Sequence, residues 1–517
     1  MHLAVTMLLS DATRKPIAKR DGSEFRDTLR QSATLPKTGR RGGTRPMHTF
    51  VLSDLHLSDA EPVDPKRPLW RAFRRRDYFV DADVIALLSF AMERAEAQGE
   101  PLEIVLNGDV LDFDPVMALP DPPPSPLHWL ARLRGMGTAE WMSSFKVEQI
   151  LRDHKELFEA LGEVARRGHQ LVFVLGNHDL ELCWPAVQQK VRQALGVSEA
   201  QQPNVRFCEW FFLSGRDTFI SHGHLFDPYC TVPDPLHPLI SVGGEPRVRL
   251  PFGEVANRYM LNGMGYFNPH ASQNYIMNAW QYAQFFFRYM VRAQPLLLWT
   301  WLWSAFATLI ITFAEFLRPP LRDPLMVEDK VAAMAERAQA TPAMVRQLAA
   351  AAEPSACTNP LMIARELWLD RALLFLGMVY AAWYLVLTVN FVVPISPWWF
   401  LLPVAGAFPF FLQYSFQVKP ETFAKPLLDP GRAHWIAGIT GARMAVIGHN
   451  HLPSLEQIGP LMVCNDGFWS PAFGDPACKQ RIGTQTFAWI RGKEGERVVE
   501  LWEWPPEAAK PEPMLPT

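Results

Sequence analysis

Five short clusters of acidic, amide and imidazole side chains stand out along this chain of 517 residues. They are Asp54 and His56, Asp109 and Asp112, Asn177 and His178, His222 and His224, and His449 and His451. Carboxylates and imidazoles are the ligands that manganese, iron, zinc and related divalent ions take in proteins. Two such ions about 3.5–4 Å apart bind a phosphoryl group and activate water for its hydrolysis. The residue types are therefore those that a pair of divalent ions acting on a phosphoryl group needs.

The ordered set is more informative than any one cluster. A lone Asp-x-His is most often a core or surface histidine, and a lone Gly-Asp is usually a turn. Here each cluster follows an apolar run of strand length, namely Thr49–Leu52, Leu102–Leu106, Leu171–Leu175, Thr218–Ile220 and Met444–Ile447. Glycines directly precede Asp109, Asn177 and His449, where we expect sharp turns at the strand ends.

Helical patterns lie between these runs, over Val80–Glu96 and Ala139–Arg166. Strands that alternate with helices predict an α/β core. The polar clusters follow the carboxyl ends of the strands, which is where open α/β sheets build their sites. We therefore expect the five clusters to meet at one edge of the fold.

In residue type and order, the clusters resemble the calcineurin-like metallophosphoesterase superfamily. The resemblance covers about residues 48–230 and 441–503. It implies an α/β fold, a two-sheet αββα sandwich, and two divalent ions, for which we expect manganese, with iron, zinc and magnesium as alternatives. Carried over by position, it implies one ion held by Asp54, His56 and His451, a second held by Asn177, His222 and His449, and Asp109 bridging both.

The resemblance also implies roles for residues beside the ions. His178 would donate a proton to the leaving oxygen or contact the phosphate, and Asp112 would orient its ring. His222 and His224 compete for one ligand position. The family pattern favours His222 and leaves His224 to contact substrate or solvent. Asp114 has no implied role, and we expect it to be an exposed loop residue.

A basic run follows the first cluster and contains Arg74, Arg75 and Arg76. We predict that these side chains bind the substrate phosphate or an anionic headgroup. The alternative is a solvated basic helix end, and the sequence leaves both interpretations open.

Part of the sequence is similar to the bacterial UDP-diacylglucosamine pyrophosphohydrolases of lipid A synthesis. The similar segments are Ser53–Leu57 and His222–Leu225. Those enzymes commonly carry Arg where this chain has His178, a histidine that many other phosphoesterases share. The similarity therefore indicates a lipid-linked substrate less firmly than it indicates metal-dependent hydrolysis.

The middle of the chain is very apolar. The run Ala372–Val418 contains no charged residue and is long enough for two membrane crossings joined near Pro394–Pro397. A further apolar segment covers Pro295–Leu317. Because His222 and His449 must reach one site, the chain must cross the membrane an even number of times. We therefore predict a hairpin, with Pro295–Leu317 lying in the interface, re-entering, or paired with Tyr275–Val291.

Basic residues indicate the orientation of the hairpin. Arg371 and Lys419 flank its outer ends, whereas no Lys or Arg lies at its tip. The positive-inside rule places the ends in the cytoplasm and Ile395 and Ser396 outside. We expect the protein in the inner or cytoplasmic membrane, with the catalytic domain facing the cytoplasm.

The expected organisation has five parts. These are a disordered basic tail (1–46), a first catalytic part (47–231), a helical membrane insertion (232–440, with the hairpin over 372–418 and the further segment over 295–317), a second catalytic part (441–503) and a flexible tail (504–517). The 50 Lys and Arg nearly balance 53 Asp and Glu, so we expect no nucleic-acid partner.

The sequence thus predicts a membrane-anchored phosphoesterase that cleaves a phosphoester or pyrophosphate bond. A lipid-linked substrate is preferred, and membrane lipids are the expected surroundings. The alternatives are a membrane-localised phosphatase for nucleotides or phosphoproteins, and a non-catalytic membrane scaffold that retains the fold. Loss of any metal-ligand cluster would favour the scaffold, and all the clusters are intact.

Overall fold

The computed structural model describes residues 46–123, 128–265, 280, 284, 286–291, 297–323, 325–418, 426–493, 495–505 and 510–514. Nearly all of the predicted basic tail lies outside these residues, and so do Lys419 and most of Tyr275–Val291. The described chain is a mixed α/β protein with several sheets, which confirms the α/β part of the predicted fold class.

The larger sheet has seven strands. In spatial order they are β14 (Glu512–Pro513), β13 (Val498–Trp504), β12 (Gln485–Arg491), β1 (His48–Leu52), β2 (Leu102–Asn107), β3 (Gln170–Val174) and β4 (Val205–Cys208). Strands β1 to β4 run parallel, and β12 pairs antiparallel with β1. The carboxyl ends of β1, β2 and β3 therefore lie at the same edge, immediately before three of the five clusters.

The smaller sheet joins the two parts of the chain that flank the insertion. Its order is β10 (Ser454–Ile458), β11 (Leu461–Asn465), β9 (Met444–Ile447), β6 (Thr218–Ile220) and β5 (Phe212–Ser214). Strand β6 pairs in parallel with β9 across the whole insertion. The fourth and fifth clusters consequently start from neighbouring strands.

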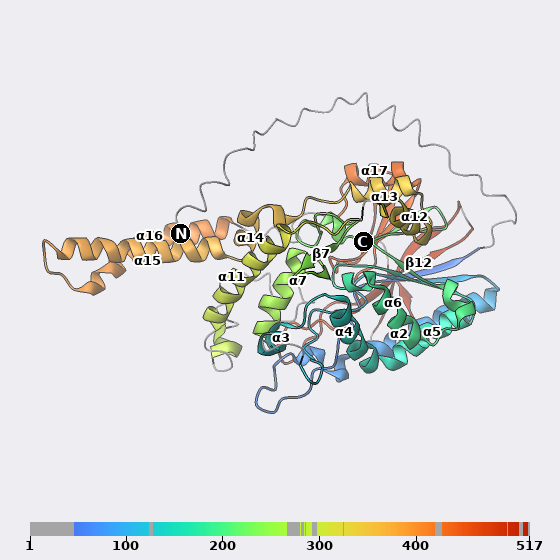
Figure 1. Cartoon of the computed structure of the whole chain (residues 1–517), viewed down its shortest axis with the longest axis horizontal. Coiled ribbons are helices and arrows are strands. Elements are labelled where there is room, and N and C mark those ends of the chain that lie inside the picture. The colour runs from blue at the N-terminus through green and yellow to red at the C-terminus, as the bar shows by residue number, and fades with distance from the viewer. Residues whose placement is uncertain are drawn as a thin grey trace, which may run out of the picture. The chain divides into compact units, whose positions relative to one another are not determined.

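Buried residues from both sheets pack together. One apolar cluster contains Val51, Val105 and Val172 of the larger sheet and Ile220 and Val446 of the smaller one. Helices cover the outer faces. Those on the larger sheet are α2 (Asp81–Gln98), α4 (Glu140–Asp153), α5 (Lys155–Arg166) and α6 (Pro185–Leu195), and those on the smaller sheet are α12 (Val327–Arg337), α13 (Pro342–Ala349) and α17 (Pro430–Thr440) (Figure 1).

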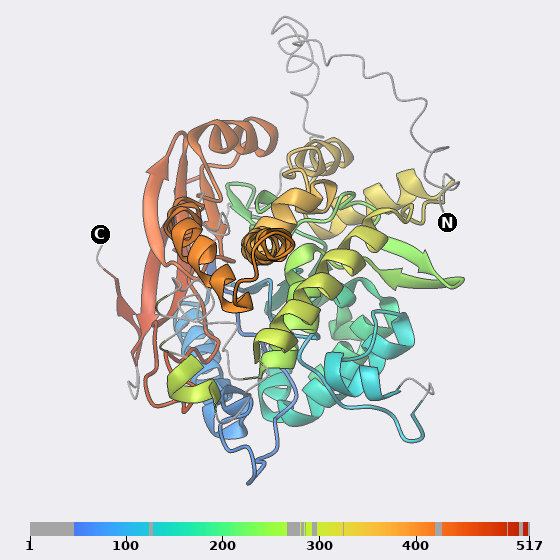
Figure 2. The same cartoon turned by 90° about the vertical axis from the view of Figure 1, so that its left-hand side faces the viewer.

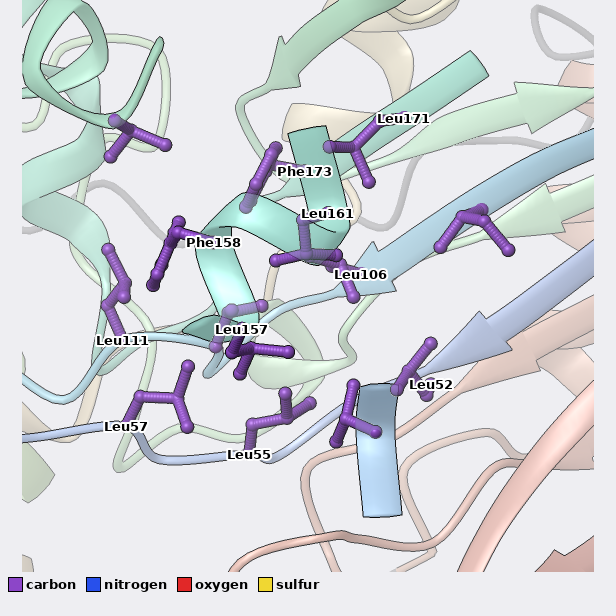
Figure 3. Packing of buried hydrophobic residues seen from close by; sticks show 14 of the residues in the cluster. Leu52, Leu55, Leu57, Leu106, Leu111, Leu157, Phe158, Leu161, Leu171 and Phe173 are labelled. Atoms are coloured by element: carbon purple, nitrogen blue, oxygen red, sulfur yellow. The ribbon is translucent and has the colours of Figure 1, made fainter. Parts of the chain in front are cut away.

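Helix α5 shows how the larger sheet is covered. Its apolar residues recur on three- and four-residue steps, so that they form one buried stripe. Leu157, Phe158 and Leu161 lie against Leu106 and Phe173 of the sheet (Figure 3). The helical pattern over Ala139–Arg166 is divided between α4 and α5 at His154, whose buried ring contacts Asp81 and the carbonyl of Ser58.

The predicted insertion also contains α12, α13 and α17. These three helices pack on the smaller sheet. The insertion further contains a small hairpin and further helices. These are β7 (Leu239–Val242), β8 (Glu245–Val248), α7 (Phe252–Ala256), the π-helix η6 (Asn257–Leu261), α8 (Asn262–Met264), α11 (Leu297–Phe316) and α14 (Pro360–Glu366).

Two helices of the insertion have the length and composition of membrane spans. They are α15 (Leu369–Asn390), with a mean hydropathy of 2.1, and the stretch Pro397–Gln417, with a mean hydropathy of 1.3, which comprises η10 (Pro397–Phe400) and α16 (Leu401–Gln417). They run side by side in Figure 1 and are seen end-on in Figure 2. Only 11% of the first window and 0% of the second are buried. Helix α11 is not among the candidate spans found in the described residues.

Candidate metal centre

The first two clusters lie on loops that run side by side. The Asp54 N–H donates to the Gly108 carbonyl at 3.0 Å, and the His56 N–H donates to the Asp109 carbonyl at 2.9 Å. In return the Asp112 N–H donates to Leu57 at 2.8 Å. Leucines between the polar residues, Leu55, Leu57 and Leu111, anchor both loops in the apolar core (Figure 3). The alternation of apolar and polar residues therefore fixes the polar side chains on one side.

One group of candidate ligands comes from the first and fifth clusters. Asp54 Oδ1 lies 3.0 Å from His451 Nε2 and 3.7 Å from His56 Nε2. Potential ligand atoms of these three residues all lie within 4.8 Å of one another. These are the residues that the sequence assigned to one ion.

A second group adjoins the first at Asp109. The Asp109 Oδ2 atom lies 3.0 Å from His222 Nε2 and 3.9 Å from His56 Nε2, between the two sets of ligands. Ligand atoms of Asp109, His222 and His449 also lie within 4.8 Å of one another. The His222 ring is oriented by its Nδ1 atom, which lies 2.9 Å from the Asn107 carbonyl and leaves Nε2 for the site.

Asn177 completes the set of predicted ligands. Its Nδ2 atom donates to Glu254 at 2.6 Å, while its buried Oδ1 atom has no hydrogen-bond partner among the described residues. A buried polar atom without a partner is costly unless an ion or water satisfies it. The structure therefore brings six of the seven predicted ligands into two adjoining groups, and Asn177 lies next to them, since the N–H of the following residue, His178, donates to Asp109. Their oxygen and nitrogen donors fit divalent ions.

The backbone at these ligands is unusual. Five of them adopt left-handed φ angles between 48° and 73°, namely Asp54, His56, Asp109, His449 and His451. Such a conformation is uncommon outside glycine and persists where the surrounding fold enforces it, as at functional sites. Glycine is needed for space at Gly176 and Gly448, because a Cβ there would collide with Asp109 and with Asp54 respectively. Neither glycine has a positive φ, so these two positions require glycine for space and not for its backbone freedom.

His178 lies at the edge of the cluster. Its Nδ1 atom is 3.1 Å from Asp112 Oδ1, as expected for an oriented ring. Its side chain is 12% exposed, whereas those of Asp54 and His222 are fully buried. Burial alone would lower the pKa of His178, but Asp112 and Asp109 beside it raise that pKa well above its usual range. These carboxylates therefore favour the protonated ring, which could donate a proton to a group that reaches it.

The buried carboxylates divide into two kinds. Burial would raise the pKa of Asp109, but His222 and His178 hold it below its usual range, so this carboxylate stays charged. In contrast, burial and the charge of Asp109 raise the pKa of Asp179 to about 7. Asp179 accepts the N–H groups of Gly176, at 2.6 Å, and Val110, at 2.9 Å, and so holds the second and third ligand loops together.

Three buried carboxylates at the site were not identified from the sequence. Asp227 Oδ2 lies 3.0 Å from His449 Nε2, Glu254 contacts Asn177, and Asp466 accepts a hydrogen bond from Ser53. Asp466 follows a buried strand in the same way as the recognised clusters and could have been found by that signal. Glu254 lies inside the insertion with no local motif, so only the fold reveals it.

The three arginines predicted to bind substrate each contact other parts of the protein. Arg74 is buried and paired with Asp59 and Glu61, and Arg76 is exposed and paired with Asp153 at 2.9 Å. Arg75 donates to the carbonyl of Pro68. Substrate binding by these arginines stays a prediction.

His224 and Asp114 are both buried. The His224 ring centroid lies 5.7 Å from that of His222, so it adjoins the cluster. The expectation that Asp114 is an exposed loop residue was wrong, since it is 4% exposed and its backbone carbonyl accepts from Asn262 at 2.8 Å.

Comparisons with known proteins assign the chain to no family. No protein-family profile matches the chain, and no curated protein is significantly similar to it. The residues and their geometry therefore carry the functional assignment.

Proposed function

We propose that this chain is a membrane-anchored phosphoesterase with two divalent metal ions, built on the αββα sandwich of the calcineurin-like enzymes. The observation that carries the proposal is the convergence of six ligand side chains, from segments on both sides of the insertion, in two groups that meet at the Asp109 carboxylate, with Asn177 beside them. Asp54, His56 and His451 would hold one ion, Asn177, His222 and His449 the other, and Asp109 would bridge them.

The ion pair, when bound, supplies Lewis acidity toward a phosphoryl oxygen and a nucleophilic water at neutral pH. The protein contributes the fixed positions of the ligands and a proton donor. His178 is suited to protonate the leaving oxygen, because its protonated form is favoured and its ring is held by Asp112 and partly exposed at the edge of the buried cluster. His451 is also partly exposed, with 18% of its side chain accessible, and we infer that the substrate approaches between these two histidines.

The exposed apolar helices support a membrane anchor. Phe391, Trp398 and Phe410 are more than 70% exposed, so the described chain gives them no apolar surroundings. A bilayer would supply such surroundings to α15 and α16 as a hairpin that crosses twice. Two crossings return the chain to the side on which it left, and this agrees with the pairing of β6 with β9. We place the catalytic domain in the cytoplasm, because of the basic residues at the ends of the hairpin.

The experiment is a substrate screen on detergent-purified protein loaded with manganese. A lipid pyrophosphate, a nucleotide, and aryl phosphate mono- and diesters would each be incubated with and without chelator. We expect at least one class to be hydrolysed, activity to be lost in chelator, and activity to return with manganese. Hydrolysis that is unchanged in chelator would refute the metal mechanism. Metal binding without hydrolysis of any class would favour a scaffold.

A further inference from the structure

Glu254 belongs to the insertion but reaches the candidate metal centre. It lies in α7, far in sequence from every recognised cluster, and is 1% exposed. Its Oε1 atom is 2.6 Å from Asn177 Nδ2 and 3.6 Å from His178 Nε2. A carboxylate in such a buried position, with its Oε2 atom making no hydrogen bond among the described residues, needs an explanation.

The contact with Glu254 determines which way the Asn177 amide faces. The amide presents its NH₂ group to Glu254, because Nδ2 donates to the Oε1 atom of that carboxyl at 2.6 Å. The carbonyl oxygen Oδ1 is then the atom left for the site, and it has no hydrogen-bond partner among the described residues. The backbone on both sides of Asn177 packs on Asp109, since the His178 N–H donates to Asp109 Oδ1 at 2.9 Å and Gly176 leaves no room for a Cβ beside that carboxylate.

Helix α7 is itself held in place by the rest of the site and by the insertion. The Gly253 N–H donates to the Tyr229 carbonyl at 2.9 Å, and the Tyr229 N–H donates to Asp227 Oδ1 at 2.8 Å. Asp227 in turn contacts His449. Phe252 packs in one apolar cluster with Ala305 of α11, so that the position of Glu254 depends on helices of the insertion.

We propose that Glu254 is a positioning residue that fixes the Asn177 amide with Oδ1 toward the second metal ion. The insertion thereby completes the metal centre as well as anchoring the chain. This inference rests on the proposed two-metal function, and it adds that the two flanking parts alone do not hold the second ion at full affinity.

The test is manganese binding to the full chain in detergent, measured by titration and by electron paramagnetic resonance. Glu254→Ala should weaken one of the two ions by about 10–100-fold, the usual effect of removing a group that orients a ligand. Its spectrum at limiting manganese should change from that of a coupled pair to that of a single ion. Glu315→Gln is the matched control, because Glu315 is also a carboxylate of the insertion but accepts from Leu250 N at 3.3 Å, away from the site.

Two conservative variants separate positioning from general stability. Glu254→Gln keeps an accepting oxygen at the same distance and should bind both ions within a few-fold of the wild type. Glu254→Asp keeps the charge but is too short to reach Asn177 and should resemble Glu254→Ala. Wild-type affinity for both ions in Glu254→Ala, or equal affinities in the Gln and Asp variants, would overturn the inference. A wild-type chain that never binds a pair of ions would instead refute the proposed function on which it rests.

Discussion

At the scale of single residues, the proposed function assigns metal binding and proton transfer to different side chains. His178 contacts Asp112 but is not needed to complete either set of ligands. His178→Ala should therefore keep both ions and lose about 100-fold or more in turnover, as expected for a lost general acid. The measurement is turnover together with metal content. His434→Ala, at an exposed position on α17, is the control, and a loss of metal in His178→Ala would show that its role is misassigned.

His224 makes the stability of the metal-free protein dependent on pH. Burial, followed by the charges of His222 and His449, lowers its pKa well below the usual value of 6.5. Below pH 6.5 the unfolded chain therefore binds a proton that folded His224 does not, and stability falls as the pH falls. The slope for one proton is about 1.4 kcal/mol per pH unit.

His224→Gln should remove this contribution. In chelator and detergent, the melting temperature of the variant relative to the wild type should rise as the pH is lowered from 8 through 6.5 toward 5. A difference between variant and wild type that stays constant over this range would contradict a neutral, buried His224.

At the scale of elements, the basic run after β1 divides into a buried and an exposed arginine. Arg74 is 4% exposed and lies between Asp59 and Glu61, so Arg74→Gln leaves Asp59 without this cation and Glu61 paired with Arg71 alone. We expect a loss of about 2–3 kcal/mol in the free energy of unfolding. Arg76→Gln, at a 65% exposed position, should change it by less than about 0.5 kcal/mol. Thermal melts of the two variants test this contrast, and equal melting temperatures would show that the Arg74 pairs contribute little.

The proposed topology of the hairpin predicts which loops are accessible from outside the cell. Ser396 is exposed between α15 and η10, at the predicted extracytoplasmic tip. Thr358 is exposed on η9 (Ala356–Thr358), whose Ala356 N–H donates to Pro228 at 2.7 Å, on the side of the catalytic domain. In a background without native cysteines, a membrane-impermeant thiol reagent should label Ser396→Cys on intact cells but label Thr358→Cys only after permeabilisation. Labelling of Thr358→Cys from outside would reverse the orientation.

Helix α11 behaves differently from the hairpin. Its Ser304, Thr308 and Thr312 are buried against the protein, whereas Trp299 and Trp303 are more than 60% exposed. In Figure 2 the hairpin is seen end-on while α11 is seen along its length. A helix with its small polar side packed inward and its aromatic side outward suits the interface of a bilayer. The prediction that Pro295–Leu317 is not a solitary crossing stays open to the labelling test.

At the scale of the whole molecule, the sequence predicted the strands that carry ligands but not the packing of the insertion. The runs ending at Leu52, Leu106, Ile220 and Ile447 are strands because their apolar residues and their length leave few alternatives. That α12, α13 and α17 cover the smaller sheet could not be predicted, because an amphipathic pattern shows that a face is buried but not against which partner.

The same limit applies to the site. Asp54, Asp109 and His449 were found because each ends a strand within a recognisable pattern. Glu254 and Asp227 were missed because their roles depend on contacts between segments that are distant in sequence or that follow no motif. Arg74 shows a further limit, since a local basic run says nothing about the acidic residues that fold onto it.

The most direct test of the two-metal centre is the manganese content per chain of the wild type and of Asp109→Ala. Asp109 lies between both groups of ligands, so its removal should affect both ions. After loading and desalting, elemental analysis should give two ions per wild-type chain and fewer than two for Asp109→Ala, with hydrolysis lost. Asp64→Ala, in an exposed loop, is the control and should keep two. Equal metal content in the wild type and Asp109→Ala, or full activity of that variant in chelator, would contradict a centre bridged by Asp109.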